Sequence, residues 1–211
     1  MRTRVKICGI TAVADGLAAA RQGADAIGLI FYPPSPRLVT LERAAEIAAG
    51  LPPFVARVAV FVNPSAAQVS AVIDGCRPSL LQFHGEETPA FCRSFGVPYL
   101  RAVRVRSGVD LLESLAPYED AAGWLLDAYR DDLYGGTGER FDWRLVPPRL
   151  ARPLVLSGGL DAANVAEAIR HVRPWAVDVS SSVESAKGVK DERLIATFIA
   201  GVRNADVRPS G

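Results

Sequence analysis

The stretch that decides the fold is residues 5–31, VKICGITAVADGLAAARQGADAIGLIF. Its first residues, Val5–Cys8, and its last, Ala26–Phe31, are short apolar runs of the length of a buried strand. Between them, Ala12–Gln22 is rich in alanine and spaces its apolar residues as an amphipathic helix does. A strand, a helix and a second strand in this order predict a βαβ unit with parallel strands.

The same alternation continues along the chain to about Val202, and eight such units can be counted. An open, doubly wound sheet also alternates strands with helices, so periodicity alone does not close the sheet. Closely spaced units without a dinucleotide-type glycine fingerprint, joined by right-handed crossovers, favour closure. We therefore predict an α/β fold in the form of a (β/α)8 TIM barrel, with eight parallel strands and surrounding helices.

The boundaries of the units follow from the same pattern. Strands are predicted at Val5–Cys8, Ala26–Phe31, Arg57–Val62, Leu80–Phe83, Tyr99–Val105, Trp124–Asp127, Leu154–Ser157 and Ala176–Val179. Helices are predicted at Ala12–Gln22, Leu41–Ala49, Ser65–Asp74, Pro89–Phe95, Val109–Leu115, Ala162–His171 and Glu192–Val202, while the helix of the sixth unit is poorly marked. Residues that commonly cap helices stand just before five helical stretches, and the predicted N-caps are Thr11, Thr40, Asn63 with Pro64, Thr88 with Pro89, and Asp161.

Length and composition limit the class of protein. The chain of 211 residues suffices for one substantial core, so we predict a single domain, 1–211, whose polar end, 204–211, frays. With 24 Lys plus Arg against 23 Asp plus Glu, no global field attracts nucleic acid. No apolar run approaches about 18 residues and no signal peptide precedes the first strand, which favours a cytoplasmic protein without a membrane partner. The composition allows a monomer or a homodimer.

Polar residues at the carboxyl ends of the predicted strands indicate where the function lies. Cys8, His84, Asp127 and Asp178 end the first, fourth, sixth and eighth strands, and Arg37 lies in the loop after the second. In a barrel of this kind these ends form one rim, which carries the active site. The three cysteines lack the spacing of a zinc site or of a disulfide framework, so Cys8 is considered as a thiol.

Small residues after three neighbouring strands predict a phosphate site. Glycine and serine let backbone N–H groups approach an anion closely, and the loops after the seventh and eighth strands are where such barrels commonly hold a phosphate. A glycine pair after one strand is more often only a tight turn, but the coincidence in adjacent loops favours an anion. The candidate phosphate-binding residues are Gly135, Gly136, Gly158, Gly159, Ser180 and Ser181.

Ordered motifs along nearly the whole chain carry a resemblance to a known family. They are Lys6–Thr11 (KICGIT), Phe31–Pro33 (FYP) with Ser35–Arg37 (SPR), Gln82–Gly85 (QFHG), Leu126–Asp127 with Gly135–Gly138 (GGTG), Phe141–Trp143 (FDW), Ser157–Leu160 (SGGL) with Asn164–Val165, Val177–Ser181 (VDVSS) through Val183–Glu184, and Gly188–Asp191 (GVKD). With these motifs in this order, the chain resembles the phosphoribosylanthranilate isomerases. An ordered set of this kind is far more specific than any single motif.

The resemblance implies a step of tryptophan biosynthesis. In it, N-(5′-phosphoribosyl)anthranilate becomes 1-(2-carboxyphenylamino)-1-deoxyribulose 5-phosphate by an Amadori rearrangement, and no cofactor or metal is implied. Ring opening needs an acid near the furanose oxygen, and the tautomerisation that follows needs a base at C2′. By the family's pattern Asp127 is the acid and Cys8 the base.

Three further residues are assigned to the small-molecule phosphoribosyl substrate. Arg37 offers a planar fork to the anthranilate carboxylate, although an exposed loop charge is the simpler reading. Asp178 is expected to bond the sugar hydroxyls or the bridging amine, to form an ion pair with Lys6, or both. His84 is expected to line the site, and a purely structural histidine is nearly as probable.

The base role requires the thiolate form of Cys8, because a free thiol has a pKa near 8.5. Alternation along the first strand places Lys6 and Cys8 on the same inward face. We therefore hypothesise that Lys6 helps to keep Cys8 anionic. The sequence does not show what would keep Asp127 protonated, and burial or a neighbouring negative charge are the two candidates.

Two departures from the family's pattern affect substrate binding rather than chemistry. The loop 128–134 carries more charge and aromatic character than expected, and Ser182 stands where a glycine is usual. Two other functions stay open at this point. The related ribotide isomerase of histidine biosynthesis usually carries two aspartates, and a non-catalytic phosphometabolite-binding barrel would not require Cys8 and Asp127.

Overall fold

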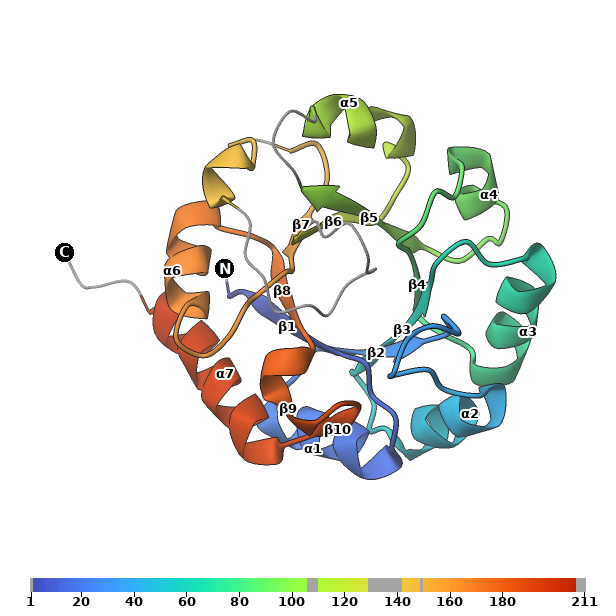
Figure 1. Ribbon diagram of the computed structural model, residues 1–211, viewed down its shortest axis with the longest axis horizontal. Coiled ribbons are helices and arrows are strands. Elements are labelled where there is room, and N and C mark those ends of the chain that lie inside the picture. The colour runs from blue at the N-terminus through green and yellow to red at the C-terminus, as the bar shows by residue number, and fades with distance from the viewer. Residues whose placement is uncertain (1, 106–109, 129–141, 149, 208–211) are drawn as a thin grey trace.

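The computed structural model describes residues 2–105, 110–128, 142–148 and 150–207, and its centre is a closed barrel (Figure 1). Eight parallel strands follow one another around the barrel in sequence order, and the first pairs with the last. This confirms the predicted (β/α)8 fold. The strands are β1 (Arg4–Cys8), β2 (Ala26–Ile30), β3 (Ala56–Phe61), β4 (Leu80–Phe83), β5 (Tyr99–Val105), β6 (Gly123–Ala128), β7 (Leu154–Leu156) and β8 (Ala176–Val179).

Helices surround the barrel and lie between consecutive strands (Figure 1). They are α1 (Val13–Gln22), α2 (Leu41–Gly50), α3 (Ala66–Cys76), α4 (Pro89–Arg93), α5 (Leu111–Leu115), α6 (Val165–Val172) and α7 (Glu192–Asp206), with short 3-10 turns η1 (Ala116–Tyr118), η2 (Trp143–Leu145) and η3 (Ser181–Val183). Between β6 and β7, the part of the chain that the structure describes contains η2 and no α-helix. None of the described helices has the length and apolarity needed to span a membrane.

The alternation of side chains along each strand separates two cores. Outward residues such as Ile7 and Leu126 are fully buried against the helices and form the larger hydrophobic cluster. Inward residues such as Leu125 and Val155 fill the barrel interior. The inward positions nearest the carboxyl ends of the strands are polar instead, and this change marks the functional rim.

Two of the five predicted N-caps are confirmed, whereas Asn63 and Asp161 are not the N-caps of α3 and α6. The hydroxyls of Thr40 and Thr88 accept hydrogen bonds from backbone N–H groups at the start of α2 and α4. The prediction for Thr11 is wrong, because α1 begins after Ala12 and has no side-chain cap. The hydroxyl of Thr11 instead donates to the carbonyl oxygen of Gly188, at 2.6 Å.

The end of the chain also differs from expectation. Helix α7 continues to Asp206, three residues into the segment 204–211 that was predicted to fray. The carboxylate of Asp206 accepts hydrogen bonds from the backbone N–H and the hydroxyl of Thr3, at 2.7 and 2.8 Å. These bonds attach the last helix to the first strand and stabilise the ordered end.

A hairpin that the sequence did not predict follows the last strand of the barrel. Strands β9 (Glu184–Ala186) and β10 (Val189–Lys190) pair antiparallel between η3 and α7. In Figure 1 this hairpin lies on the side of α1, beside the loops that follow the first two strands. Glu184 and Lys190 at its two ends have buried side chains and belong to the site described next.

Candidate active site

The rim at the carboxyl ends of the strands brings together the residues that were predicted to converge there. Cys8, Arg37, His84, Asp127 and Asp178 are all buried, although four of them are polar or charged. Buried polar side chains away from partners are costly, so each is expected to have a specific contact. Their contacts fall into three groups, around Asp178, Asp127 and Arg37.

Asp178 forms an ion pair across the seam that closes the barrel. Lys6 on β1 and Asp178 on β8 are partners in the strand register, and Lys6 Nζ lies 2.9 Å from Asp178 Oδ1. The hydroxyl of Ser157 donates to the other carboxylate oxygen at 3.4 Å. Burial lowers the pKa of Lys6, but the negative charges of Asp178 and Cys8 outweigh it and raise the pKa overall. The ion pair considered for Asp178 is therefore present.

The Cys8 thiol lies inside the barrel next to this pair. Burial raises its pKa, and the charge of Lys6 lowers the pKa by less than burial raises it. The direction of the Lys6 effect agrees with our hypothesis, although the pKa of Cys8 stays above its usual value. Gly28 on the adjacent strand makes room for the thiol, because a Cβ there would lie 2.6 Å from Cys8 Sγ and 3.2 Å from Lys6 Nζ.

The opposing effects of burial and Lys6 lead to a testable expectation for the Lys6→Met variant. Removal of the ammonium group leaves burial and Asp178, which both disfavour the thiolate, so the pKa of Cys8 should rise above that of the wild type. The measurement is the pH dependence of iodoacetamide alkylation, followed on the Cys8 peptide by mass spectrometry to separate it from Cys76 and Cys92. Lys187→Met, in the exposed hairpin, is the matched control. A Cys8 that titrates no higher than in the wild type would contradict this effect.

Asp127 at the end of β6 faces His84 at the end of β4. His84 Nε2 lies 3.3 Å from Asp127 Oδ2, and the backbone N–H of Ala128 donates to Asp127 Oδ1 at 2.9 Å. On the far side of the imidazole, Gln82 Nε2 lies 3.4 Å from His84 Nδ1. His84 thus lies next to Asp127, but among the described residues its Nε2 atom makes no hydrogen bond.

Asp178 lies on the same rim as the two proposed catalytic groups. Burial raises the pKa of Asp178, although the charge of Lys6 opposes this effect. Cys8 and Asp127 lie at the carboxyl ends of β1 and β6 and are buried on the same rim as Asp178. Two groups that accept or release a proton, placed around one opening, are suited to a reaction with two proton transfers.

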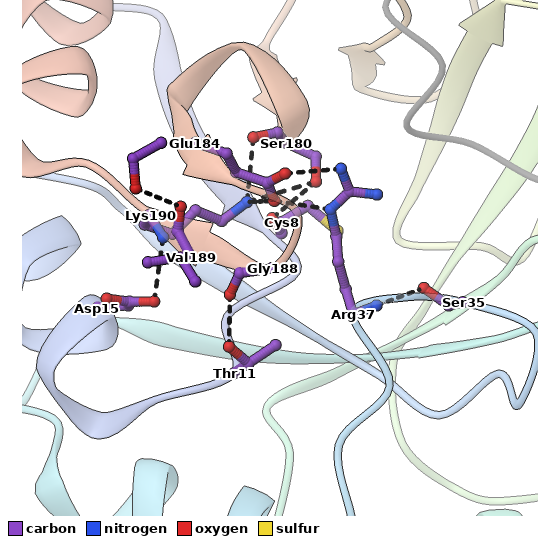
Figure 2. A network of polar contacts seen from close by, with 11 residues as sticks. Cys8, Thr11, Asp15, Ser35, Arg37, Ser180, Glu184, Gly188, Val189 and Lys190 are labelled. Carbon is purple, nitrogen blue, oxygen red and sulfur yellow. Dashed lines mark hydrogen bonds and ion pairs between the residues drawn. The ribbon is translucent and has the colours of Figure 1, made fainter.

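Arg37 is neither exposed nor free. Its guanidinium forms two parallel hydrogen bonds with Glu184, from Nε at 2.7 Å and from Nη2 at 2.8 Å. Lys190 Nζ binds the same carboxylate at 2.7 Å and the carbonyl oxygen of Ser180 at 3.0 Å (Figure 2). Glu184 and Lys190 belong to motifs of the resemblance, but the sequence analysis predicted no role for them because neither ends a strand of the barrel.

The loops after β7 and β8 have the conformation expected of an anion site. Gly158 and Gly159 adopt φ values of +86° and +64°, which other residues rarely adopt, and a Cβ at Gly158 would lie 2.4 Å from the Ala128 nitrogen. Among the described residues, no hydrogen bond uses the backbone N–H of Gly158, Gly159 or Ser181. These donors are available to a ligand. Gly135 and Gly136 lie outside the described residues.

Side chains fix the positions of these two loops. Asn164 Nδ2 donates to the carbonyl oxygen of Gly159 at 2.8 Å, and the hydroxyl of Ser180 donates to the carbonyl oxygen of Cys8 at 3.0 Å. Ser182, which stands where glycine is usual, donates to the carbonyl oxygen of Leu160 at 2.6 Å. Its side chain therefore links the loop after β8 to the loop after β7.

Comparisons with known proteins agree with this geometry. Residues 5–201 match the family model described as N-(5′-phosphoribosyl)anthranilate (PRA) isomerase. A protein of Dechloromonas aromatica named N-(5′-phosphoribosyl)anthranilate isomerase is 54% identical over 206 residues, which cover 98% of this chain and 99% of that one.

Solved structures extend the likeness to three dimensions. The phosphoribosyl anthranilate isomerase of Thermotoga maritima superposes with a TM-score of 0.88 at 42% identity, over 96% of this chain and 99% of that chain. A structure of such an isomerase in complex with reduced 1-(o-carboxyphenylamino)-1-deoxyribulose 5-phosphate gives a TM-score of 0.85 at 42% identity, with the same coverage.

Proposed function

Because the chain belongs to the N-(5′-phosphoribosyl)anthranilate isomerase family, we propose that Cys8 is the general base and Asp127 the general acid of its reaction. The chain is an isomerase of tryptophan biosynthesis that acts on N-(5′-phosphoribosyl)anthranilate. The observation that carries the assignment is the burial of both groups at the carboxyl ends of β1 and β6, on one rim of the barrel.

The two groups fit the two proton transfers of the rearrangement. Asp127 gives its proton to the furanose oxygen as the bond between that oxygen and C1′ breaks and the nitrogen lone pair forms a C=N bond. Cys8, as thiolate, then takes the proton from C2′, and the electron pair of the C–H bond moves toward C1′ and the nitrogen. Tautomerisation of the resulting enol gives the ketone. Both groups thus act on atoms that are bonded to C1′ of one sugar.

Binding residues surround these groups. Arg37 is proposed to bind the anthranilate carboxylate, and only the side of its guanidinium that Glu184 leaves unoccupied can do so. The backbone N–H groups of Gly158, Gly159 and Ser181 are proposed to bind the phosphate, with Ser180 and the undescribed Gly135 and Gly136 completing the site. Asp178, already paired with Lys6, keeps an oxygen 3.4 Å from Ser157 and is proposed to contact the sugar.

Substrate choice provides the test of this function. The purified protein is offered N-(5′-phosphoribosyl)anthranilate and, separately, the aminoimidazole carboxamide ribotide of histidine biosynthesis. We expect turnover of the first, followed by anthranilate fluorescence, and none of the second, because Cys8 stands where the histidine enzyme usually has an aspartate. Activity on the imidazole ribotide alone, or binding of both without turnover, would contradict the assignment.

All proposed site residues belong to one chain. We propose that the protein works as a monomer or a homodimer, since no role above requires a residue from a second copy. Assembly then affects stability rather than the chemistry of the site.

A further inference from the structure

The least expected feature of the rim is the carboxylate that occupies Arg37. We infer that Glu184 is a positioning residue: it turns the guanidinium of Arg37 so that its outer edge meets the carboxylate of the substrate. The inference deepens the proposed function and rests on the assignment of Arg37 to that carboxylate. Four observations support it, namely the edge used, the charge, the burial and the anchoring of the hairpin.

The geometry of the ion pair leaves a defined part of Arg37 available. Glu184 binds the Nε and Nη2 edge of the guanidinium with two short hydrogen bonds. Nη1 points away from Glu184 in Figure 2. A guanidinium has five N–H donors in one plane, so its Nη1 and Nη2 edge can still bind a second carboxylate with two parallel bonds. Glu184 thereby fixes the plane in which that second carboxylate must lie.

The charges of the cluster leave room for one anion. Glu184 is shared by Arg37 and by Lys190. Burial lowers the pKa of Lys190 although Glu184 opposes this effect, and with all three groups ionised the cluster carries a net charge of one positive unit. Burial raises the pKa of Glu184, but the hydrogen bonds and charges of Arg37 and Lys190 outweigh it and lower the pKa overall. Glu184 is therefore ionised at neutral pH, and the surplus positive charge matches a single ligand carboxylate.

Burial makes the cluster rigid. The side chains of Glu184 and Arg37 are 5% and 8% exposed, and that of Lys190 is fully buried. Charged groups in such surroundings are held by their partners, because an unpaired charge away from water is strongly unfavourable. A neutral residue in place of Glu184 would leave two cations facing each other and free to turn.

The hairpin that carries Glu184 is attached to the loops around Arg37. The hydroxyl of Thr11 donates to the carbonyl oxygen of Gly188, and the backbone N–H of Lys190 donates to Asp15 Oδ2 at 3.2 Å (Figure 2). Thr11 and Asp15 lie at the start of the first unit, whereas Arg37 lies in the second. The hairpin therefore holds Glu184 at a fixed place relative to the first two units of the barrel.

The test compares two ligands in the Glu184→Gln variant. One is the reduced product analogue with its carboxyl group, and the other is the same compound without that group. In the wild type we expect tighter binding of the carboxylate ligand. In Glu184→Gln this preference should fall about tenfold or more, because a charge-assisted bond to a correctly oriented partner is lost. KM for the substrate should rise by a larger factor than kcat falls.

Controls separate this effect from damage to the fold. Ser185→Ala changes an exposed residue of the same hairpin and should retain the wild-type preference. Glu184→Asp keeps the negative charge on a shorter side chain and should retain part of the preference for the carboxylate ligand. If Glu184→Gln does not fold, Glu184→Asp is compared with the wild type in its place. A general loss of structure would weaken both ligands equally and would contradict the positioning role.

The two assignments fail in different ways. A wild type that binds both ligands equally well would contradict the role of Arg37, and with it the proposed function of that residue. A wild type that prefers the carboxylate ligand, together with a Glu184→Gln variant of undiminished preference, would leave Arg37 assigned and overturn the role of Glu184.

Discussion

Replacement of Cys8 by serine is expected to lower kcat by about 10²- to 10⁴-fold, the range that a positioned proton-transfer group contributes. Serine has nearly the same shape as cysteine, but its hydroxyl does not ionise in the pH range of the enzyme. The thiol lies next to Lys6 and Gly28, and the smaller serine side chain fits there without displacing its neighbours. The loss should therefore appear in turnover and not in the binding of the reduced product analogue.

The pH dependence of kcat/KM in the wild type should reflect the ionisation of the Cys8 thiol. Burial raises the pKa of Cys8 above that of an ordinary thiol, near 8.5. A base acts in its deprotonated form, so kcat/KM should increase with pH and continue to increase above that value. Cys76→Ser is the matched control, since Cys76 lies at the end of α3 and away from the rim. Unchanged turnover in Cys8→Ser would remove the base from the mechanism.

Replacement of Asp127 by asparagine should lower kcat by a similar factor, about 10²- to 10⁴-fold. Asparagine keeps the size of the side chain and an oxygen that can accept the hydrogen bond from the Ala128 N–H. It has no proton to give to the furanose oxygen, so ring opening becomes the slow step. Single-turnover fluorescence should show intact substrate bound to the variant.

Asp110→Asn is the control for this substitution. Asp110 caps the exposed start of α5, where asparagine caps as well as aspartate does. It should leave kcat and the unfolding temperature close to those of the wild type. If Asp127→Asn turned over substrate as fast as Asp110→Asn does, another group would have to be the acid.

The barrel was predictable because each strand carries its own signal. Runs such as Val5–Cys8 and Leu80–Phe83 are mostly apolar because helices cover one side and the barrel interior the other. Cys8 and His84, at or just after the ends of these runs, mark the rim. Closure followed from the number of units. Once the barrel was predicted, the strand ends had to share one edge. The convergence of the polar side chains at that edge could therefore be predicted, and they are Cys8, His84, Asp127 and Asp178.

Contacts between loops that are distant along the chain could not be predicted from the sequence. Thr11 precedes a helix as a cap would, but its hydroxyl binds Gly188, which lies 177 residues away along the chain. Glu184 follows a strand at no special position, so nothing local indicates that it pairs with Arg37. The overall pKa shift of Cys8 could not be predicted for a related reason, because the degree of burial that outweighs Lys6 depends on the whole barrel.

The attachment of the last helix and hairpin to the first strand bears on how activity is acquired during folding. Thr3 meets Asp206 through one pair of hydrogen bonds, and Thr11 meets Gly188 through another contact near the rim. Asp178 and Glu184 reach the site only when the C-terminal part of the chain packs against the N-terminal strand and the loop that follows it. Recovery of catalysis after denaturation should thus follow ring closure, whereas recovery of helical signal should precede it.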